Sequence, residues 1–382
     1  MASQVQVKGW SYKITPARIV MAALAALAAA IAVYRLCTGL GTVSNLSDEW
    51  PWGLWIGFDV LTGVALAGGG YGTALLVHVL HIEKFNVIAR SAMLTSLLGY
   101  LLVLIGLFLD IGQWFNFWRP FVSWGYHSVL FEVFWCVSIY TTVQMIEFGE
   151  IATERIGKKW HKPLMKIMPF LFILGILLPT LHQSSLGGLY IIAVDKLHPL
   201  WWSMLLPVFF LMSSFFVGPA MVCVETTLAG KALNHQVDPK ILRSLIRISG
   251  VVMILYLLLK FGDLIHRDAL GYIFTGSLEG NMFLLEMVVG VIIPIIICFG
   301  PWSKTRAGLF TFGVLTAIGL VINRMNVVFT GMYQALGPGY FPSWMEFAVT
   351  IGLVSGAVLV YLFIAENFNI LGHGEEHQTE TA

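Results

Sequence analysis

The sequence predicts an all-α protein that crosses a membrane about ten times, and both its composition and its apolar segments indicate this. Hydrophobic residues make up 58% of the 382 residues and charged residues only 11%, whereas soluble domains carry about 25% charge. The mean hydropathy is +0.81. About ten apolar segments approach or exceed the roughly 20 residues that span a bilayer. Because the lipid core forbids unpaired backbone groups and the segments show no alternation, we expect helices rather than strands.

The expected spans follow one another along the chain with short loops between them. We place them at 17–37, 53–80, 90–110, 127–148, 164–181, 203–228, 244–265, 280–299, 306–331 and 343–365. The first is expected to be a signal anchor or a true transmembrane helix, because no small-residue cleavage site ends it and "YRLC" follows. Residues 1–16 precede it. Residues 367–382 form an acidic tail that ends in "HGEEHQTETA" and is expected to be disordered.

Lysine and arginine set the expected orientation of these spans. Most of the 22 Lys and Arg residues fall at the side of the membrane that holds both termini, so the positive-inside rule makes both termini cytoplasmic. The aromatic stretches "EWPWGLW", "QWFNFWRPFVSWGY", "HPLWWS" and "GYFPSW" then lie outside. They are typical of interface anchoring, and their concentration at one side also suits a docking protein or an apolar, ring-shaped ligand.

A weak internal repeat indicates two four-helix units in the same orientation. "FLDIGQW" ends the third span with Asp110, and "FGDLIHR" ends the seventh with Asp263; Glu132 and Glu286 follow near the start of the next span in each case. We therefore expect one bundle of helices 2–5 and one of helices 6–9, flanked by helices 1 and 10. The corresponding divisions are 17–50 for the first helix and outer loop, 51–200 and 201–335 for the bundles, and 336–366 for the last helix.

Ionisable residues inside the spans are costly and are therefore functional candidates. Asp59, Glu132 and Glu286 are predicted to lie inside the second, fourth and eighth spans. Glu225 near the inner end of the sixth span and Arg324 in the outer half of the ninth are long enough to reach water instead. Another acid–base combination, Lys260 with Asp263, is expected to form a structural ion pair. The glycine run "GVALAGGGYG" in the second span favours close helix packing, with a flat wall for a planar ligand as the alternative.

The fourth span carries a polar stripe along one helical face. Glu132, Cys136, Tyr140, Gln144 and Glu147 follow at spacings of four, four, four and three, which places them on one side of a helix. Such a stripe can carry protons through side chains and water, or it can hold neighbouring helices together by hydrogen bonds. Both interpretations remain open for the stripe as a whole, whereas for Glu132 a functional role is favoured.

The stretch "LPTLHQSSLGGLY" places four polar residues directly after an apolar run that is expected to end at Pro179. His182 and Gln183 begin this cluster, and Gly187 and Gly188 are expected to let the chain turn after it. The cluster either forms the outer edge of a binding site or is a helix cap and loop with His182 in water.

Cysteines and histidines indicate no metal centre in this chain. Cys37, Cys136, Cys223 and Cys298 contain no C-x-x-C pair, so we expect neither an iron–sulfur cluster nor a zinc site. A membrane haem needs two histidines at matching depth on facing helices. None of the ten histidines forms such a pair in mid-membrane, so no haem is expected, although His127 with His182 stays open.

Several stretches together resemble a known family. "PWGLWIGFDVLTG", "LPTLHQSSLGGLY", "KLHPLW", "FGDLIHRDAL" and "YFPSW" look like the integral membrane subunit of periplasm-facing nickel–iron hydrogenases of the Hyb type, within the wider NrfD-like family. The resemblance runs from about Tyr34 to Trp344. One departure is Lys260, where an arginine would be expected, and lysine lacks the forked guanidinium.

The resemblance implies a cofactor-free, quinone-reactive subunit of the bacterial inner membrane. It implies partners on the periplasmic side, namely a ferredoxin-like iron–sulfur subunit and the small and large hydrogenase subunits, with membrane lipid around the chain and no nucleic acid. It also implies a quinone site near the outer face of the first bundle. The residues carried over to its lining are Asp59, Asp110, Trp114, Glu132, His182 and Gln183.

The expected reaction is the reduction of menaquinone or a related quinone by electrons from the external partner. His182 donates a hydrogen bond to the quinone, and Glu132 with Asp59 supplies protons. The expected proton path runs through Glu147, Gln144, Tyr140, Tyr100 and Glu132, and a second path in the other bundle through Glu225, Asp263, Glu286 and Arg324. Three alternatives remain: a polysulfide-, nitrite- or multihaem-cytochrome-linked quinol oxidoreductase subunit, a secondary transporter, and a purely structural anchor.

Overall fold

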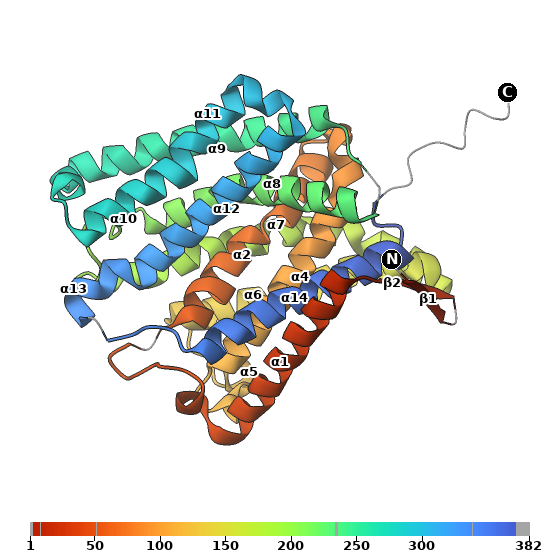
Figure 1. Ribbon diagram of the computed structural model, residues 1–382, viewed down its shortest axis with the longest axis horizontal. Coiled ribbons are helices and arrows are strands. Elements are labelled where there is room, and N and C mark those ends of the chain that lie inside the picture. The colour runs from red at the N-terminus through yellow and green to blue at the C-terminus, as the bar shows by residue number, and fades with distance from the viewer. Residues whose placement is uncertain (1–2, 8, 51, 234–235, 338, 372–382) are drawn as a thin grey trace.

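Long helices lie side by side and make up almost the whole molecule in the computed structural model (Figure 1). The structure describes residues 3–7, 9–50, 52–233, 236–337 and 339–371. Within these ranges, ten helical segments are long and apolar enough to cross a membrane. The prediction of an all-α polytopic membrane protein is therefore confirmed. Part of the predicted acidic tail, residues 372–382, lies outside the described residues.

The helices agree closely with the expected spans. The long helices are α1 (Pro16–Thr38), α4 (Asn86–Asp110), α6 (Val129–Arg155), α7 (His161–Ile191), α8 (Leu206–Leu233), α9 (Pro239–His266), α12 (Arg306–Val328) and α14 (Trp344–Asn367). Two spans contain wider, π-helical turns: the second consists of η2 (Trp55–Thr62), α2 (Gly63–Leu66), α3 (Gly69–Ala74) and η3 (Leu75–Val79), and the eighth of α10 (Leu278–Met287), η8 (Val288–Ile292) and α11 (Ile293–Phe299).

Short helical turns connect these spans. They are η1 (Leu40–Thr42), η4 (Glu83–Phe85), η5 (Trp114–Asn116), α5 (Arg119–Val122), η6 (Lys158–Trp160), η7 (Leu270–Phe274), η9 (Pro301–Lys304), η10 (Thr330–Met332) and α13 (Tyr333–Leu336). Local sequence fixes several helix starts, because a side-chain oxygen accepts from the backbone of the first turn. Ser128 accepts from the Phe131 amide at the start of α6, and Ser343 and Glu346 form a reciprocal capping box at the start of α14.

A β-hairpin that the sequence analysis did not predict precedes α1. Strands β1 (Ser3–Val7) and β2 (Trp10–Ile14) pair antiparallel, and Gly9 turns between them with φ +83°. The Trp10 ring contacts the rings of Phe363 and Phe368, and Nδ2 of Asn367 donates to the Ser11 carbonyl oxygen at 2.7 Å. The hairpin therefore lies against the end of α14, and both ends of the described chain lie at the same end of the bundle.

Glycines bring α3 and α8 into backbone contact near the centre of the molecule. A Cβ atom on Gly218 would lie 2.6 Å from the carbonyl carbon of Gly68, and one on Gly69 would lie 3.1 Å from the carbonyl oxygen of Gly218. Such distances leave no room for a side chain or for a planar ligand. The glycine run in this span therefore serves helix packing. Helix α8 also packs against α7, which belongs to the first predicted bundle, and against α9 and α12, which belong to the second. The division of the chain into two bundles remains a prediction.

The expected end of the fifth span at residue 181 was wrong. Helix α7 continues through Pro179 to Ile191, because proline is tolerated in membrane helices whose neighbours satisfy the freed backbone groups. Gly187 and Gly188 therefore do not form a turn. Gly187 instead lets α7 approach the start of α8, where a Cβ atom would lie 2.5 Å from the Leu206 carbonyl oxygen.

Candidate functional site

His182 lies on α7 about two and a half turns before the helix ends, and both His182 and Gln183 are 0% exposed. Nε2 of His182 lies 2.9 Å from the hydroxyl oxygen of Tyr100 on α4, and Nδ1 lies 3.3 Å from the Leu178 carbonyl oxygen. Because a carbonyl only accepts, the neutral ring donates from Nδ1 and accepts the Tyr100 proton at Nε2. The alternative in which His182 is a solvated loop residue is wrong.

The polar stripe of α6 continues inward from this pair. Nε2 of Gln144 donates to the Ser96 hydroxyl at 2.6 Å and to the Tyr140 hydroxyl at 3.0 Å. The Tyr140 ring meets the Tyr100 ring edge to face, with centroids 4.5 Å apart. Tyr100, Tyr140, Gln144 and Ser96 are all buried. We call these four residues, together with His182, the His182 cluster.

Glu147 lies at the inner end of the same face of α6 and is 6% exposed. Gly175 of α7 makes room for it, because a Cβ atom there would lie 2.9 Å from Oε1 of Glu147. Among the described residues no hydrogen bond joins Glu147 to Gln144, or the Tyr100 hydroxyl to that of Tyr140. A proton moving along this line would need a water molecule or a side-chain rotation at those two steps.

Glu132 lies near the start of the fourth span, where it was placed from the sequence, and its side chain is not buried. It is exposed in the first turn of α6, where Oε1 accepts a hydrogen bond of 2.7 Å from the Ser185 hydroxyl of α7. Cys136 is half-buried. The stripe therefore begins at the surface and becomes buried from Tyr140 onward. Since Ser185 is three residues after His182 on α7, the Glu132–Ser185 contact lies about one turn outward from the His182 cluster.

Asp59 and Asp110 form a separate group. Oδ2 of Asp59 on η2 accepts from the Thr350 hydroxyl of α14 at 2.8 Å, and Asp110 ends α4. Ten residues separate Tyr100 from Asp110 on α4, which is about 15 Å along the axis. A quinone head group that contacts Tyr100 therefore cannot contact Asp110 as well. The predicted lining residues therefore fall into two groups, and Trp114, whose Nε1 donates to the Leu36 carbonyl oxygen at 3.0 Å, belongs with Asp110.

Glu225 lies against α4 and α14 rather than near Glu286. Its Oε1 accepts from the Tyr361 hydroxyl at 2.9 Å, while Oε2 and the nearby Thr95 hydroxyl have no partner among the described residues. Thr95 and Glu225 line one small void, and Ser91 and Tyr361 line a second cavity of about 10 Å³ on the inner side, about the room one water molecule needs. Glu225 therefore packs against α4, the helix that also carries Ser96 and Tyr100 of the His182 cluster, and its contacts among the described residues include none with Glu286.

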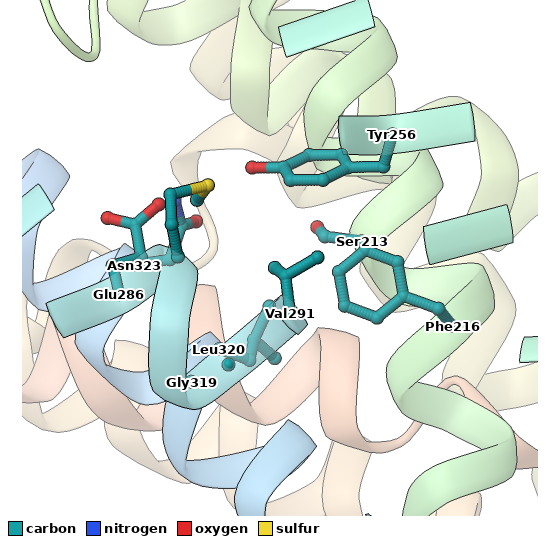
Figure 2. A pocket seen from close by; sticks show the side chains of 10 residues that line it. Ser213, Phe216, Tyr256, Glu286, Val291, Gly319, Leu320 and Asn323 are labelled. Carbon is teal, nitrogen blue, oxygen red and sulfur yellow. The ribbon is translucent and has the colours of Figure 1, made fainter. Parts of the chain in front are cut away.

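Glu286 is the centre of a buried polar group in the second half of the chain, and both of its carboxylate oxygens are paired. It accepts from Nε1 of Trp201 at 2.9 Å and from the amides of Asn323 and Asn326 at 2.7 and 2.9 Å. Arg324 is 1% exposed and does not reach water; it donates to Oδ1 of Asn323. Figure 2 shows Tyr256, Ser213, Glu286 and Asn323 around a cavity of about 10 Å³, again room for about one water molecule.

The expected ion pair between Lys260 and Asp263 is wrong. Asp263 pairs with Arg267, whose Nη2 lies 2.7 Å from Oδ2, and accepts from the Ser203 hydroxyl at 2.9 Å. The ammonium group of Lys260 instead lies over the ring of Phe209, 4.9 Å from its centroid. The side chain leans onto aromatic faces because a cation over a ring is attracted by the ring quadrupole.

His182 and His127, the one histidine pair left open from the sequence, do not fit a haem ligand pair. Such a pair needs two imidazole nitrogens free to face one iron, whereas both ring nitrogens of His182 are engaged, and the predicted alternative partner His127 is exposed. The described residues also contain no cluster of three or more His, Cys, Asp or Glu side chains that could hold a metal ion.

Sequence reasoning missed the polar residues that other elements bring to these groups. Ser96, Thr350 and Tyr361 are buried and bond to the predicted residues Gln144, Asp59 and Glu225. Arg35 and Glu346 are buried as well and bond to other parts of the chain. Serine, threonine and tyrosine are common in membrane helices, so their identity carries little signal. Arg35 and Glu346 carried a usable signal, because a charge near the end of an apolar span must find a partner.

The chain is similar to several known proteins. The family description "Polysulphide reductase, NrfD" matches residues 42–337. The "Probable Ni/Fe-hydrogenase 2 b-type cytochrome subunit" of Escherichia coli K12 is 34% identical over 89% of this chain and 88% of its own length. The "Menaquinone reductase, integral membrane subunit" of Nitratidesulfovibrio vulgaris is 30% identical over 86% of this chain and 85% of its own length.

Proposed function

Because the chain belongs to the NrfD family of polysulphide reductase membrane subunits, we propose that it is the quinone-reactive membrane subunit of an oxidoreductase complex and that it serves a hydrogenase. The observation that carries this proposal is the buried His182–Tyr100 pair with its polar continuation along α6. The names of two relatives, a hydrogenase subunit and a menaquinone reductase subunit, support the same activity.

The proposed reaction takes two electrons and two protons and converts a menaquinone to its quinol. The electrons come from an iron–sulfur partner at the outer surface, and this chain supplies the protons. A proton taken up at Nε2 turns His182 from acceptor to donor. A quinone oxygen then takes the place of the Tyr100 hydroxyl at Nε2, and His182 gives its proton to that oxygen. The displaced Tyr100 hydroxyl donates a hydrogen bond to the same oxygen.

Glu132 is proposed to act at the outer entrance of this site. Its carboxylate is exposed and held by Ser185 one turn outward from His182, so it can exchange protons with a head group that enters between α6 and α7. Asp59 bonds to Thr350 of α14 and has no hydrogen bond to the His182 cluster among the described residues, so no step at that cluster is assigned to it. The inner supply of protons is proposed to run through Glu147 and Gln144, with Glu225 as a second source by way of Thr95 and Ser96.

The partner surface is proposed at the segment between α4 and α6. Six of its large aromatic residues are exposed side by side in the sequence, and such exposed apolar patches are typical of a protein-binding surface; they are Phe115, Phe117, Trp118, Phe121, Trp124 and Tyr126. The proposed partners are a periplasmic iron–sulfur subunit and the hydrogenase subunits. A polysulfide-, nitrite- or cytochrome-linked complex of the same family is the second candidate, and copurification of the partner subunits distinguishes them.

Replacing Glu225 by Gln tests the second proton source. We expect the rate of quinone reduction to fall roughly tenfold, because one proton-transfer group typically contributes a hundredfold or more but a parallel supply through Glu147 remains. The measurement is reduction of a soluble menaquinone analogue by the purified complex. Thr227→Ala is the matched control, because its hydroxyl bonds only to its own helix at Cys223. An unchanged rate in the Glu225 variant would remove this residue from the path.

Replacing Glu286 by Gln tests the proposed second proton path. We expect the variant to reduce quinone at half the wild-type rate or more, because Glu286 lies apart from the His182 cluster. The number of protons moved across the membrane per electron is expected to decrease. The measurement is proton uptake in sealed vesicles that contain the complex. If the proton-to-electron ratio stays the same, the Glu286 group has a structural role only.

A further inference from the structure

Four exposed lysines gather where α6 ends and α7 begins, at the predicted cytoplasmic end of the molecule. They are Lys158, Lys159, Lys162 and Lys166. Lys158, Lys162 and Lys166 follow one another at spacings of four, and η6 and α7 join without a break between them. These three residues therefore lie on one side of the helical segment, and we call them the lysine face.

Arginines at the same end of the molecule are used inside the protein, whereas the lysine face is not. Arg18 pairs with Glu366 and Arg90 pairs with Glu154, each at 2.6 Å. Among the described residues, no side chain of the lysine face takes part in an ion pair. Since Glu154, an acid close to these lysines in the sequence, is already bound to Arg90, the lysine face presents its charge to an anion from outside the chain.

The same side of α7 continues as an exposed apolar face. Phe170, Ile173 and Leu177 follow Lys166 at spacings of four, three and four and are 63, 60 and 50% exposed. In this span 22% of the residues are buried, against 61% in the span of α8, so much of α7 faces lipid. From Phe170 to Leu177 the helix rises about 10 Å, which lies within the roughly 15 Å hydrocarbon depth of one leaflet.

A cationic face at the membrane surface that continues into an apolar face matches the two parts of an anionic phospholipid. A soluble anion or an acidic peptide would use the lysines and leave the apolar face uncovered, and a zwitterionic lipid would leave the lysine charges unbalanced. We propose that this side of α7 binds an anionic phospholipid. Its phosphate lies beside Lys162 and Lys166, and one acyl chain lies along Phe170, Ile173 and Leu177.

The inference is independent of the proposed quinone chemistry. His182 follows Lys166 by 16 residues on α7, which is about 24 Å along the axis, so the lipid position and the His182 cluster are separate. Helix α7 packs against α6 and α8, and the bound lipid covers the side that these helices leave exposed.

Native mass spectrometry of the full chain, purified in detergent, measures the affinity for each lipid. The chain is titrated with dioleoyl phosphatidylglycerol and with dioleoyl phosphatidylcholine, and the wild type is expected to bind the first more tightly. The double variant Lys162→Gln, Lys166→Gln is expected to bind phosphatidylglycerol about 25-fold more weakly, about fivefold for each lysine lost. Its affinity for phosphatidylcholine should stay within twofold, and its thermal unfolding temperature in phosphatidylcholine should match the wild type.

The matched control is the double variant Lys231→Gln, Lys240→Gln, which removes the same charge from the ends of α8 and α9. It is expected to bind phosphatidylglycerol within twofold of the wild type. If both double variants weaken binding equally, or if neither does, the basic surface attracts anionic lipid only in general and the inference is overturned.

Two further measurements separate the lipid from other occupants of the lysine face. Glycerol 3-phosphate is expected not to displace phosphatidylglycerol, because it lacks the acyl chains; displacement would show a site for a soluble anion and contradict the proposal. A chain that ends at Leu371 is expected to bind the lipid as the full chain does. A large gain in affinity would show that the acidic residues 372–382 occupy the lysines instead, and would also contradict it.

Discussion

Replacing His182 by Asn is expected to lower quinone reduction about a hundredfold. The imidazole is the only group in the His182 cluster with a nitrogen that accepts in one protonation state and donates in the other, and removing a positioned acid or base typically costs a hundredfold or more. Asparagine keeps a donor near the Leu178 carbonyl but cannot carry the proton. The measurement is the rate of menaquinone-analogue reduction by the purified complex.

The controls for this prediction separate chemistry from assembly. Copurification of the partner subunits and their activity with a soluble dye should stay unchanged, because the His182 cluster is buried and faces no partner surface. Tyr100→Phe, which removes only the hydroxyl, should give a smaller loss of about tenfold. A His182 variant with the wild-type rate would show that protons reach the quinone elsewhere.

Replacing Gly218 by Val is expected to have the largest effect on stability, a loss of about 3 kcal/mol or failure to fold. The backbones of α3 and α8 are in contact at this position, so the side chain must push the two helices apart. Thermal unfolding of the purified chain measures the effect. Gly72→Ala on the partner helix α3 is the control, because nothing lies within 4 Å of its Cβ position. Equal stability of the two variants would contradict this view of the helix contact.

Hydropathy was sufficient to predict the spans because each must cross the bilayer independently of its neighbours. It was insufficient at Pro179, where neighbouring helices and not the local sequence allow α7 to continue. The hairpin before α1 was missed because its pairing depends on the aromatic end of α14, which is far away in the sequence.

The sequence alone was even less sufficient to predict the candidate site than to predict the fold. Spacing correctly placed Tyr140, Gln144 and Glu147 on one face of α6, since helical periodicity alone determines this. It could not show that Glu132, on the same face, is exposed, because exposure depends on where α7 lies. Nor could it show that Asp59 and His182 belong to different groups, because that requires the relative position of α4 and the flanking helices.

A structure of the complex with bound menaquinone analogue, determined by electron cryomicroscopy, tests the central claim most directly. The account predicts a head-group oxygen about 3 Å from Nε2 of His182, with the Tyr100 hydroxyl beside it and the tail leaving between α6 and α7 near Glu132. A head group bound only beside Asp59 and Asp110, with the Tyr100–His182 hydrogen bond intact, would contradict it.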